Sequence, residues 1–340
     1  MKDFIVVTGA SGNVGRQVAK ALLATGQATR VVARTAEKLK SLGSLGAEII
    51  PGSLDDRNFL TGALRGARAA FVICPVNVSA KDVNAEQKRN VESIGAAIRD
   101  SGVKHVVAVS SWGLEVPEKI GAMVGCHWLE NELDAISGLN VVHLRAVWFM
   151  ENFLWNIGLI KMAGINGLSI KADLPMPMIA SSDVAAVAAD YLTALGFTGR
   201  SIHQLNGPRD YTMIELTSAL GASIGKPHLG YVEFPEGIFR KGLISNGGLS
   251  PNAADMLIEI NRAINSGRVK AVPRSKSNTT PTTLEEFAKN VFAPAFKAAP
   301  DPSFSDRLGG FMLRSLLLAT GHRAKCTCSR TTSTNEARSA

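Results

Sequence analysis

The sequence predicts an α/β protein with a doubly wound parallel sheet and a smaller α+β C-terminal lobe. Over about the first 150 residues, short β-branched runs alternate with longer stretches of helical period. These runs are apolar at successive positions, as in strands that helices cover on both faces. A glycine-rich loop directly after the first run is also typical of such sheets.

The first half divides into predicted strands joined by helices. Strands are expected at residues 4–8, 30–34, 47–51, 69–74, 105–111 and 140–145. Helices are expected at residues 14–25, 36–45, 55–64, 84–101 and 124–137. In the fourth helix Val91, Ile94 and Ile98 fall on one stripe, and Gly102 follows where a left-handed cap belongs.

The pattern changes after residue 146. Helices are expected at residues 148–162, 182–195, 212–225, 251–265 and 287–296, and a strand at 231–234. Thr212 and Thr283 each precede a Glu by three residues, a capping-box pattern that marks the start of two of these helices. We therefore assign residues 1–150, with 181–206 returning to them, to the sheet domain, and 151–180 with 207–297 to a substrate-side lobe.

Residues 298–340 are rich in Pro, Ser, Thr and Arg, with one short apolar stretch at 311–319. We predict a disordered basic tail there, with at most a transient helix. Residues 301–340 hold six Lys or Arg against three Asp or Glu, which is +3 of the net charge of +8. The remaining +5 forms no dense basic helix, so no nucleic-acid partner is expected.

Composition excludes several classes of protein. With 340 residues, 46% of them hydrophobic and 19% charged, the chain is not wholly disordered. No apolar run reaches the length of a spanning helix, and the N-terminus lacks the apolar core of a signal peptide. The four cysteines are too scattered for a disulfide framework. We expect a cytoplasmic protein without a membrane partner.

The loop at residues 9–15, GASGNVG, lies between the first strand and the first helix. Gly9 permits a tight turn, Gly12 lets the backbone approach a pyrophosphate, and Gly15 permits close packing of helix on strand. This context favours a dinucleotide site over a merely structural turn. The rest of the predicted contact set in the loop is Ser11, Asn13 and Val14.

The end of the second strand selects between the two nicotinamide cofactors. An NAD site places Asp or Glu there, whereas a 2′-phosphate needs positive charge. This chain has Arg34, with Lys38 one helical turn later. We therefore predict NADP(H) in preference to NAD(H), although Arg34 could also be a solvated strand end.

Later strand ends supply the other candidate cofactor contacts. Asp55 could cap the following helix or accept from the adenine amino group. Cys74 and Pro75 end the fourth strand, near the expected ribose and nicotinamide, although Cys74 is better explained by packing than by chemistry. Ser110 and Ser111 end the fifth strand, and Ser111 could hydrogen-bond a substrate oxygen or cap the turn.

These motifs together resemble the NmrA-like family of atypical short-chain dehydrogenases. The resemblance covers about residues 1–297 and rests on residues 6–15 (VVTGASGNVG), Ser110 and Ser111, residues 144–153 (LRAVWFMENF) and residues 284–288 (LEEFA). It implies a Rossmann domain, NADP(H) at the glycine loop and a substrate cleft between the lobes. Family members include NADPH-dependent quinone and azo-dye reductases, and also proteins that bind the dinucleotide as a signal.

The chain departs from the family pattern in two places. Ala146 stands where the family commonly has Pro after the Arg of the sixth strand. His127 stands where many reductases of the family have Lys, which puts the family's proton donor in doubt here. His127 and Ser111 are the weak catalytic candidates. We place His127 with Glu130, Asn131 and Asp134 on a polar helix face that either lines the cleft or meets solvent.

The sequence lacks the Tyr-x-x-x-Lys pair of ordinary short-chain dehydrogenases, and no metal site is visible. Hydride transfer to a quinone remains feasible, because water or a polar side chain can supply the proton. Trp112, Trp148 and Phe149 would form an aromatic wall for flat substrates, whereas Phe153 is better explained by core packing.

Three functional hypotheses follow. The leading one is an NADPH-dependent reductase of quinone-like, azo or other conjugated acceptors. The rival is a non-catalytic NADP(H)-sensing protein whose C-terminal lobe meets a partner protein. A weaker third is a reductase or isomerase of a specialised metabolite. The oligomeric state is not predicted.

Overall fold

The computed structural model describes residues 3–116 and 118–326. Its centre is a seven-stranded sheet in the order β10-β6-β5-β4-β1-β2-β3, with every neighbouring pair parallel. The strands are β1 Phe4–Val7, β2 Ala28–Ala33, β3 Glu48–Pro51, β4 Ala69–Ile73, β5 His105–Ser111, β6 Asn140–Ala146 and β10 Arg200–Leu205. The strand order reverses between β1 and β4, where sheets of this kind bind ligands. The predicted doubly wound sheet is confirmed.

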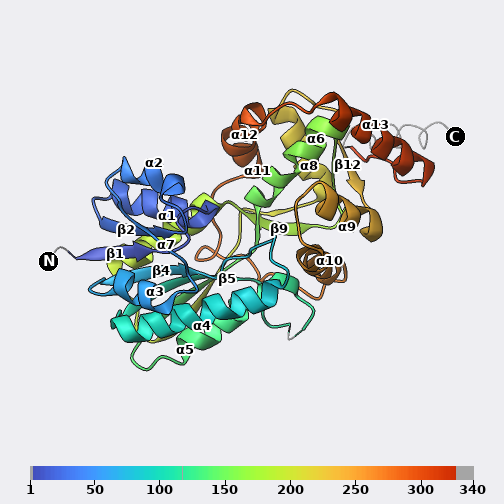
Figure 1. Ribbon diagram of the computed structural model, residues 1–340. Coiled ribbons are helices and arrows are strands. Elements are labelled where there is room, and N and C mark those ends of the chain that lie inside the picture. Colours follow the sequence, from blue (N-terminus) through green and yellow to red (C-terminus); the bar gives the residue numbers. More distant parts are fainter. Residues whose placement is uncertain (1–2, 117, 327–340) are drawn as a thin grey trace.

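Helices cover both faces of this sheet (Figure 1). On one face α1 (Asn13–Ala24) packs against α7 (Ser181–Ala194). The other face carries α3 (Arg57–Leu64), α4 (Val83–Ser101) and α5 (Val124–Asp134). Short helices complete this half: η1 Ala36–Leu39, α2 Lys40–Gly43 and η2 Gly121–Met123. Strand β1 is apolar at successive positions because Val7 faces the core with α1 while Val6 faces the core with α4.

The smaller lobe mixes short strands with helices. Its strands are β7 Trp148–Phe149, β8 Ile165–Leu168, β9 Met176–Ile179, β11 Asp210–Tyr211 and β12 Gly230–Glu233, which pair as β11-β9-β7 and as β12-β8. Its helices are η3 Met150–Asn156, α6 Ile157–Ala163, α8 Met213–Ser223, α9 Glu236–Ser245, α10 Pro251–Asn265, α11 Leu284–Phe287, η4 Ala288–Phe292, α12 Ala293–Ala298 and α13 Phe304–Ala319. Both predicted capping boxes are present, at Thr212 and Thr283.

In this lobe one expectation is wrong, and one helix was not expected. The helix predicted over 148–162 begins instead as strand β7 and the 3₁₀-helix η3, because Trp148 pairs with Met178 of β9. Pairing with a distant strand outweighs the local helical period here. Helix α9 was not predicted.

Part of the predicted disordered tail is ordered, because residues 304–319 form helix α13. Helix α13 begins at a capping box formed by Ser303 and Asp306 and packs on α6. At Gly310 the two helices approach so closely that a Cβ atom would lie 2.2 Å from the Met162 carbonyl oxygen. Residues 327–340 lie outside the described part. No helix among the described residues is long and apolar enough to cross a membrane.

Candidate functional site

The loop after β1 leaves the N-terminus of α1 without a side-chain cap. Gly9 has a φ of +62°, in the left-handed region that favours glycine. A Cβ atom at Gly15 would lie 2.5 Å from the Gly9 carbonyl oxygen, so helix and loop could not approach as they do. The N-cap residue is Gly12, and no side chain accepts from the first N–H groups of the helix. Those groups are free to meet an anion.

The other predicted contacts in this loop differ in exposure. Asn13 is exposed at the first position of α1, Ser11 is half-buried, and Val14 is buried in the core. An anion at this helix end would therefore meet the Asn13 side chain and backbone N–H groups.

Three cations gather where β1 and β2 end. Arg34 directly follows β2, and Lys38 lies in η1. Both are exposed, and neither forms an ion pair within residues 3–116 and 118–326. The neighbouring Glu37 is already paired with Lys40. Arg16 of α1 donates to the carbonyl oxygens of Ser11 at 3.2 Å and Lys38 at 3.5 Å, and thus ties the glycine loop to the segment after β2.

Asp55 does not cap the next helix. The cap of α3 is Asp56, whose carboxylate accepts from the Phe59 N–H at 2.9 Å. The capping alternative for Asp55 is therefore wrong. Asp55 itself is exposed, which leaves its carboxylate open to a ligand.

The thiol at the end of β4 is buried and neutral. Cys74 is 5% exposed, and a Cβ atom at Gly125 of α5 would lie 2.9 Å from its sulfur. Burial raises the pKa of the Cys74 thiol and raises that of Cys126 to about 12. Neither thiol is a nucleophile at neutral pH, which agrees with a packing role for Cys74. Pro75 follows it, half-buried.

A buried ionic network lies beneath the ends of β5 and β6. Arg145 donates from Nε and Nη2 to the two carboxylate oxygens of Glu130, at 2.9 and 2.6 Å. The Ser110 hydroxyl donates to the same carboxylate at 2.5 Å. Burial by itself would raise the pKa of Glu130, but these hydrogen bonds hold the pKa below its ordinary value. Glu130 is therefore ionised at neutral pH.

This network corrects one expectation. Glu130 is 5% exposed and does not share the open polar face of α5 with His127. Arg145 is a half-buried cation in strand β6 and requires a countercharge, which α5 supplies.

The two weak catalytic candidates, Ser111 and His127, differ in how they are held. Ser111 is the last residue of β5, is half-buried, and makes no side-chain hydrogen bond to any described residue. His127 lies in the first turn of α5. Its ring is exposed, and no residue in the described ranges hydrogen-bonds it. Nothing therefore holds His127 toward the strand ends.

The four aromatic residues do not form one surface. Trp112 and Phe153 are 6% and 1% exposed and lie in the core. The packing interpretation of Phe153 is therefore confirmed. Trp148 and Phe149 of β7 are half-buried, and the Trp148 Nε1 has no partner among the described residues. Only this pair is available to a flat ligand.

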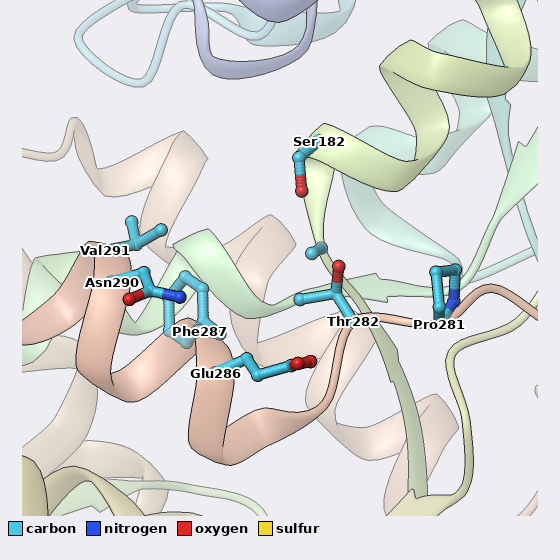
Figure 2. A pocket seen from close by; sticks show the side chains of 8 residues that line it. Ser182, Pro281, Thr282, Glu286, Phe287, Asn290 and Val291 are labelled. Atoms are coloured by element: carbon cyan, nitrogen blue, oxygen red, sulfur yellow. The ribbon is translucent and has the colours of Figure 1, made fainter.

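A pocket of about 330 Å³ opens between the N-terminus of α7 and the segment that leads into α11 (Figure 2). It is lined by Ala180, Ser182, Pro281, Thr282, Glu286, Phe287, Asn290 and Val291. Because α1 and α7 both run antiparallel to the strands they connect, their N-termini lie at the same edge of the sheet.

Buried carboxylates hold the wall of this pocket. Asp183 of α7 accepts from the Thr282 N–H at 3.0 Å and from its hydroxyl at 2.5 Å. Glu151 accepts from the Ser181 hydroxyl at 2.6 Å and from its N–H. Burial raises the pKa of Glu151. These bonds fix the start of α7 to both η3 and the segment before α11.

Most of the sequence matches a known protein family. The model of the NmrA-like family matches residues 1–288. The chain belongs to the NmrA-like family. The resemblance read from the glycine loop, the strand-end serines and the LRAVWFMENF segment is thereby confirmed.

Three relatives are reductases by name. The (4-alkanoyl-5-oxo-2,5-dihydrofuran-3-yl)methyl phosphate reductase of Streptomyces griseus is 34% identical over 224 residues, which are 66% of this chain and 74% of that protein. Quinone oxidoreductase 2 of Escherichia coli is 28% identical and covers 85% of this chain and 98% of its own. The NAD(P)H azoreductase of Xenophilus azovorans is 26% identical and covers 87% and 100%.

Solved structures of NmrA-like proteins share this fold. The E. coli NADPH-dependent quinone oxidoreductase complexed with NADPH superposes with a TM-score of 0.70 at 25% identity, over 85% of this chain and 100% of that one. NmrA, a negative transcriptional regulator in complex with NADP, superposes with a TM-score of 0.66 over 88% and 98%. At 14% identity the likeness to NmrA is one of fold alone.

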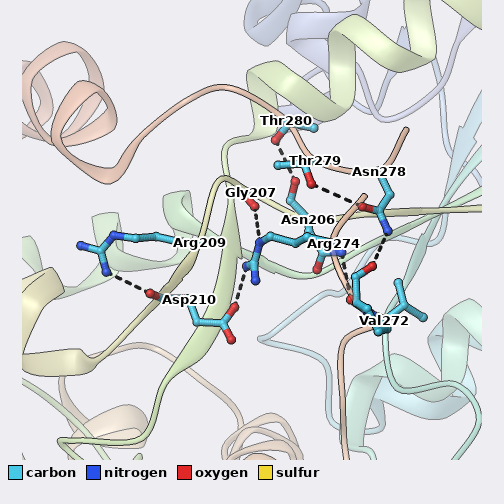
Figure 3. Close-up of polar contacts among 10 residues, drawn as sticks. Asn206, Gly207, Arg209, Asp210, Val272, Arg274, Asn278, Thr279 and Thr280 are labelled. Carbon is cyan, nitrogen blue, oxygen red and sulfur yellow. Dashed lines mark hydrogen bonds and ion pairs between the residues drawn. The ribbon is translucent and has the colours of Figure 1, made fainter. Parts of the chain in front are cut away.

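In this NmrA-like chain a polar cluster fastens the smaller lobe to the sheet (Figure 3). Asn206, just after β10, donates from its N–H to the Asn278 carbonyl at 2.7 Å and accepts from the Thr280 N–H at 2.8 Å. Arg274 donates to the Gly207 carbonyl at 2.7 Å and to the Asp210 carboxylate at 2.5 Å. The segment before α11 is thus held against the edge strand.

Sequence reasoning missed Arg16, Glu151 and the pocket beside α7. Arg16 carried a usable signal, since it follows Gly15 on the helix that faces the phosphates. Glu151 and the pocket carried none, because they depend on contacts between segments about 30 and 100 residues apart.

Proposed function

We propose that this chain is an NADPH-dependent reductase that delivers hydride to a quinone-like, azo or other conjugated acceptor. The observation that carries the proposal is that Arg34 and Lys38, neither of which forms an ion pair with a described residue, lie beside the uncapped N-terminus of α1. That arrangement suits a dinucleotide with an extra phosphate. Relatives named quinone oxidoreductase and azoreductase extend over most of the chain.

The residues present fit NADPH. Gly12, Ser11 and Asn13 would hold the pyrophosphate with the first N–H groups of α1, and Gly9 and Gly15 bring backbone close enough to do so. Arg34 and Lys38 would hold the 2′-phosphate, with Arg16 fixing the loop between them. The remaining proposed contacts are Asp55 at the adenine, and Cys74, Pro75 and Ser110 near the ribose and nicotinamide. When bound, NADPH supplies the hydride.

The protein's own task is then to orient the acceptor and exclude competing reactions. Trp148 and Phe149 offer half-buried rings for a flat acceptor. Ser111 has a free hydroxyl at the end of β5 that would donate to the acceptor oxygen. Glu130 is ionised and therefore cannot donate a proton. Its carboxylate instead positions Ser110 and Arg145 by hydrogen bonds. Water at the open edge supplies the proton that accompanies the hydride, with His127 as the secondary donor.

Steady-state oxidation of NADPH, followed by its absorbance with a panel of quinones and azo dyes, tests this function. Turnover with at least one conjugated acceptor and a preference for NADPH over NADH is expected. Tight NADPH binding without turnover of any acceptor would overturn the reductase.

The second candidate is a protein that binds NADP(H) as a signal. The missing Tyr-x-x-x-Lys pair favours it, as does the shared fold of the NmrA regulator. It predicts tight binding of the dinucleotide, no turnover, and a protein partner that is captured only in one redox state of the cofactor.

A further inference from the structure

Helix α13 presents an apolar face to solvent. Six large apolar side chains on it are 50–83% exposed: Phe304, Leu308, Phe311, Met312, Leu316 and Leu318. We call these six residues the outer face of α13. Isolated exposed apolar residues are ordinary, but six on one helix form a continuous patch, and such patches mark interaction sites.

The outer face lies on the side of α13 opposite to the side that packs on α6. Residues 304, 308, 311 and 318 recur at helical spacing on one side. Gly310 and Leu317, on the other side, pack on α6, and Leu317 is 2% exposed. Figure 1 shows α13 along the outer edge of the smaller lobe, away from the sheet. The lobe itself therefore does not cover the outer face.

Positive charge without a countercharge borders the outer face. Arg307 and Arg314, seven residues apart, lie along one side of it, and Arg323 and Lys325 follow the helix. None of the four forms an ion pair within residues 3–116 and 118–326. The nearby acids are engaged, since Asp301 pairs with Lys161 and Asp306 accepts from Ser303.

Two other occupants fit this face poorly. Residues 327–340, TCSRTTSTNEARSA, contain no large apolar side chain that could cover it. A second copy that docked through the same face would place Arg307 and Arg314 against like charges, because Asp301 and Asp306, the acids beside this face, are already engaged. The helix also lies beyond residue 288, where the family match ends, so it is an addition to the shared fold.

We propose that α13 docks the protein on an anionic lipid surface. The outer face enters the boundary between headgroups and acyl chains, while Arg307 and Arg314 meet lipid phosphates. With 16 residues α13 lies in the plane of the surface and does not span it. The proposal differs from the expectation of no membrane partner, which rested on the lack of a spanning segment. The proposal does not depend on the proposed function.

Co-sedimentation of the full-length protein with vesicles tests the proposal. One set of vesicles contains phosphatidylcholine alone and the other a mixture with phosphatidylserine. We expect the protein to pellet with the mixed vesicles, less with the neutral ones, and less at high salt. The double variant L308S/F311S should lose binding. Neutralising two charges in R307Q/R314Q should weaken binding about 30-fold, since each cation contributes about fivefold.

The matched control is Leu45→Ser, a change at an equally exposed leucine on the sheet domain, which should bind like the unaltered chain. The altered side chains are exposed, so the melting temperature should hold, and the arginine variant provides an independent reading if L308S/F311S does not fold. Absence of pelleting, or pelleting that neither α13 variant weakens, would overturn the proposal. So would a dimer in light scattering that L308S/F311S dissociates, because a second copy would then occupy the face.

Discussion

Arg145 and Glu130 form a two-point ion pair at 2.6 and 2.9 Å that joins strand β6 to helix α5. Ser110 of β5 donates to the same carboxylate, so two strand ends and one helix meet in a single network. This network lies beneath the edge where the glycine loop and Ser111 are found. Its loss would therefore affect both the stability of the sheet domain and the geometry of the candidate site.

Replacing Glu130 by Ala should lower the free energy of unfolding by about 3 kcal/mol, because it leaves the half-buried Arg145 guanidinium without its countercharge. Urea denaturation measures this. Glu132→Ala is the control on the same helix. Its ion pair with Arg99, at 3.4 Å, is more exposed and should contribute less than about 1 kcal/mol. Equal losses in the two variants would contradict the buried network.

The two buried carboxylates should give pH dependences of opposite sign. The pKa of Glu130 is lowered in the folded protein, so its contribution to stability is present above the ordinary pKa and is lost as the pH falls through the folded value. Burial raises the pKa of Glu151, so the folded state holds its proton longer and stability falls as the pH rises through that range.

Unfolding free energies from about pH 3 to 7 for the unaltered chain, Glu130→Gln and Glu151→Gln would separate these effects. The advantage of the unaltered chain over Glu130→Gln should shrink toward low pH. The stability of the unaltered chain relative to Glu151→Gln should instead increase toward low pH. If both differences in unfolding free energy changed with pH in the same direction, the pKa of Glu130 would not be lowered or that of Glu151 would not be raised.

Arg34→Glu should weaken NADPH binding by about 30- to 100-fold while changing NADH binding little, because a charged contact to a phosphate is worth about 2 to 3 kcal/mol. Fluorescence titration of both cofactors measures this. Arg65→Glu is the matched control, since Arg65 is also exposed and forms no ion pair in the part of the chain described. Equal loss of NADPH and NADH would show that Arg34 does not meet the 2′-phosphate.

Gly15→Ala should destabilise the protein by about 1 to 3 kcal/mol and abolish dinucleotide binding, because the new methyl would lie 2.5 Å from the Gly9 carbonyl oxygen. Gly62→Ala in α3 is the control. Its Cβ atom meets nothing within 4 Å, so the change should be neutral or stabilise by up to about 1 kcal/mol. Thermal unfolding and cofactor titration of both variants check this. If Gly15→Ala still bound the dinucleotide, the close approach of α1 to the Gly9 carbonyl would not be needed for binding.

Ser111→Ala should lower kcat/KM for a quinone about tenfold, as expected for one hydrogen bond to the reacting oxygen. His127→Ala should change turnover less than about twofold, because its ring is exposed and no described residue orients it. Steady-state kinetics over a range of pH distinguish the two. A large loss in His127→Ala with an altered pH profile would make His127 the proton donor instead of water.

The sequence by itself determined what depends on neighbours along the chain. The strand and helix alternation, the glycine loop and the capping boxes at Thr212 and Thr283 are patterns among residues that are close together in the chain. The cations at Arg34 and Lys38 were visible for the same reason. These features suffice to establish the sheet and the place of the candidate cofactor site.

Only the tertiary structure decided which polar groups are buried together. Glu130 looked like a residue of an open helix face until Arg145, on another element, required a countercharge. Residues 148 and 149 became a strand because β9 lies beside them, and residues 304–319 became an ordered helix because Gly310 lets it approach α6. Burial and pairing depend on contacts between distant segments, and a pattern along one segment does not contain them.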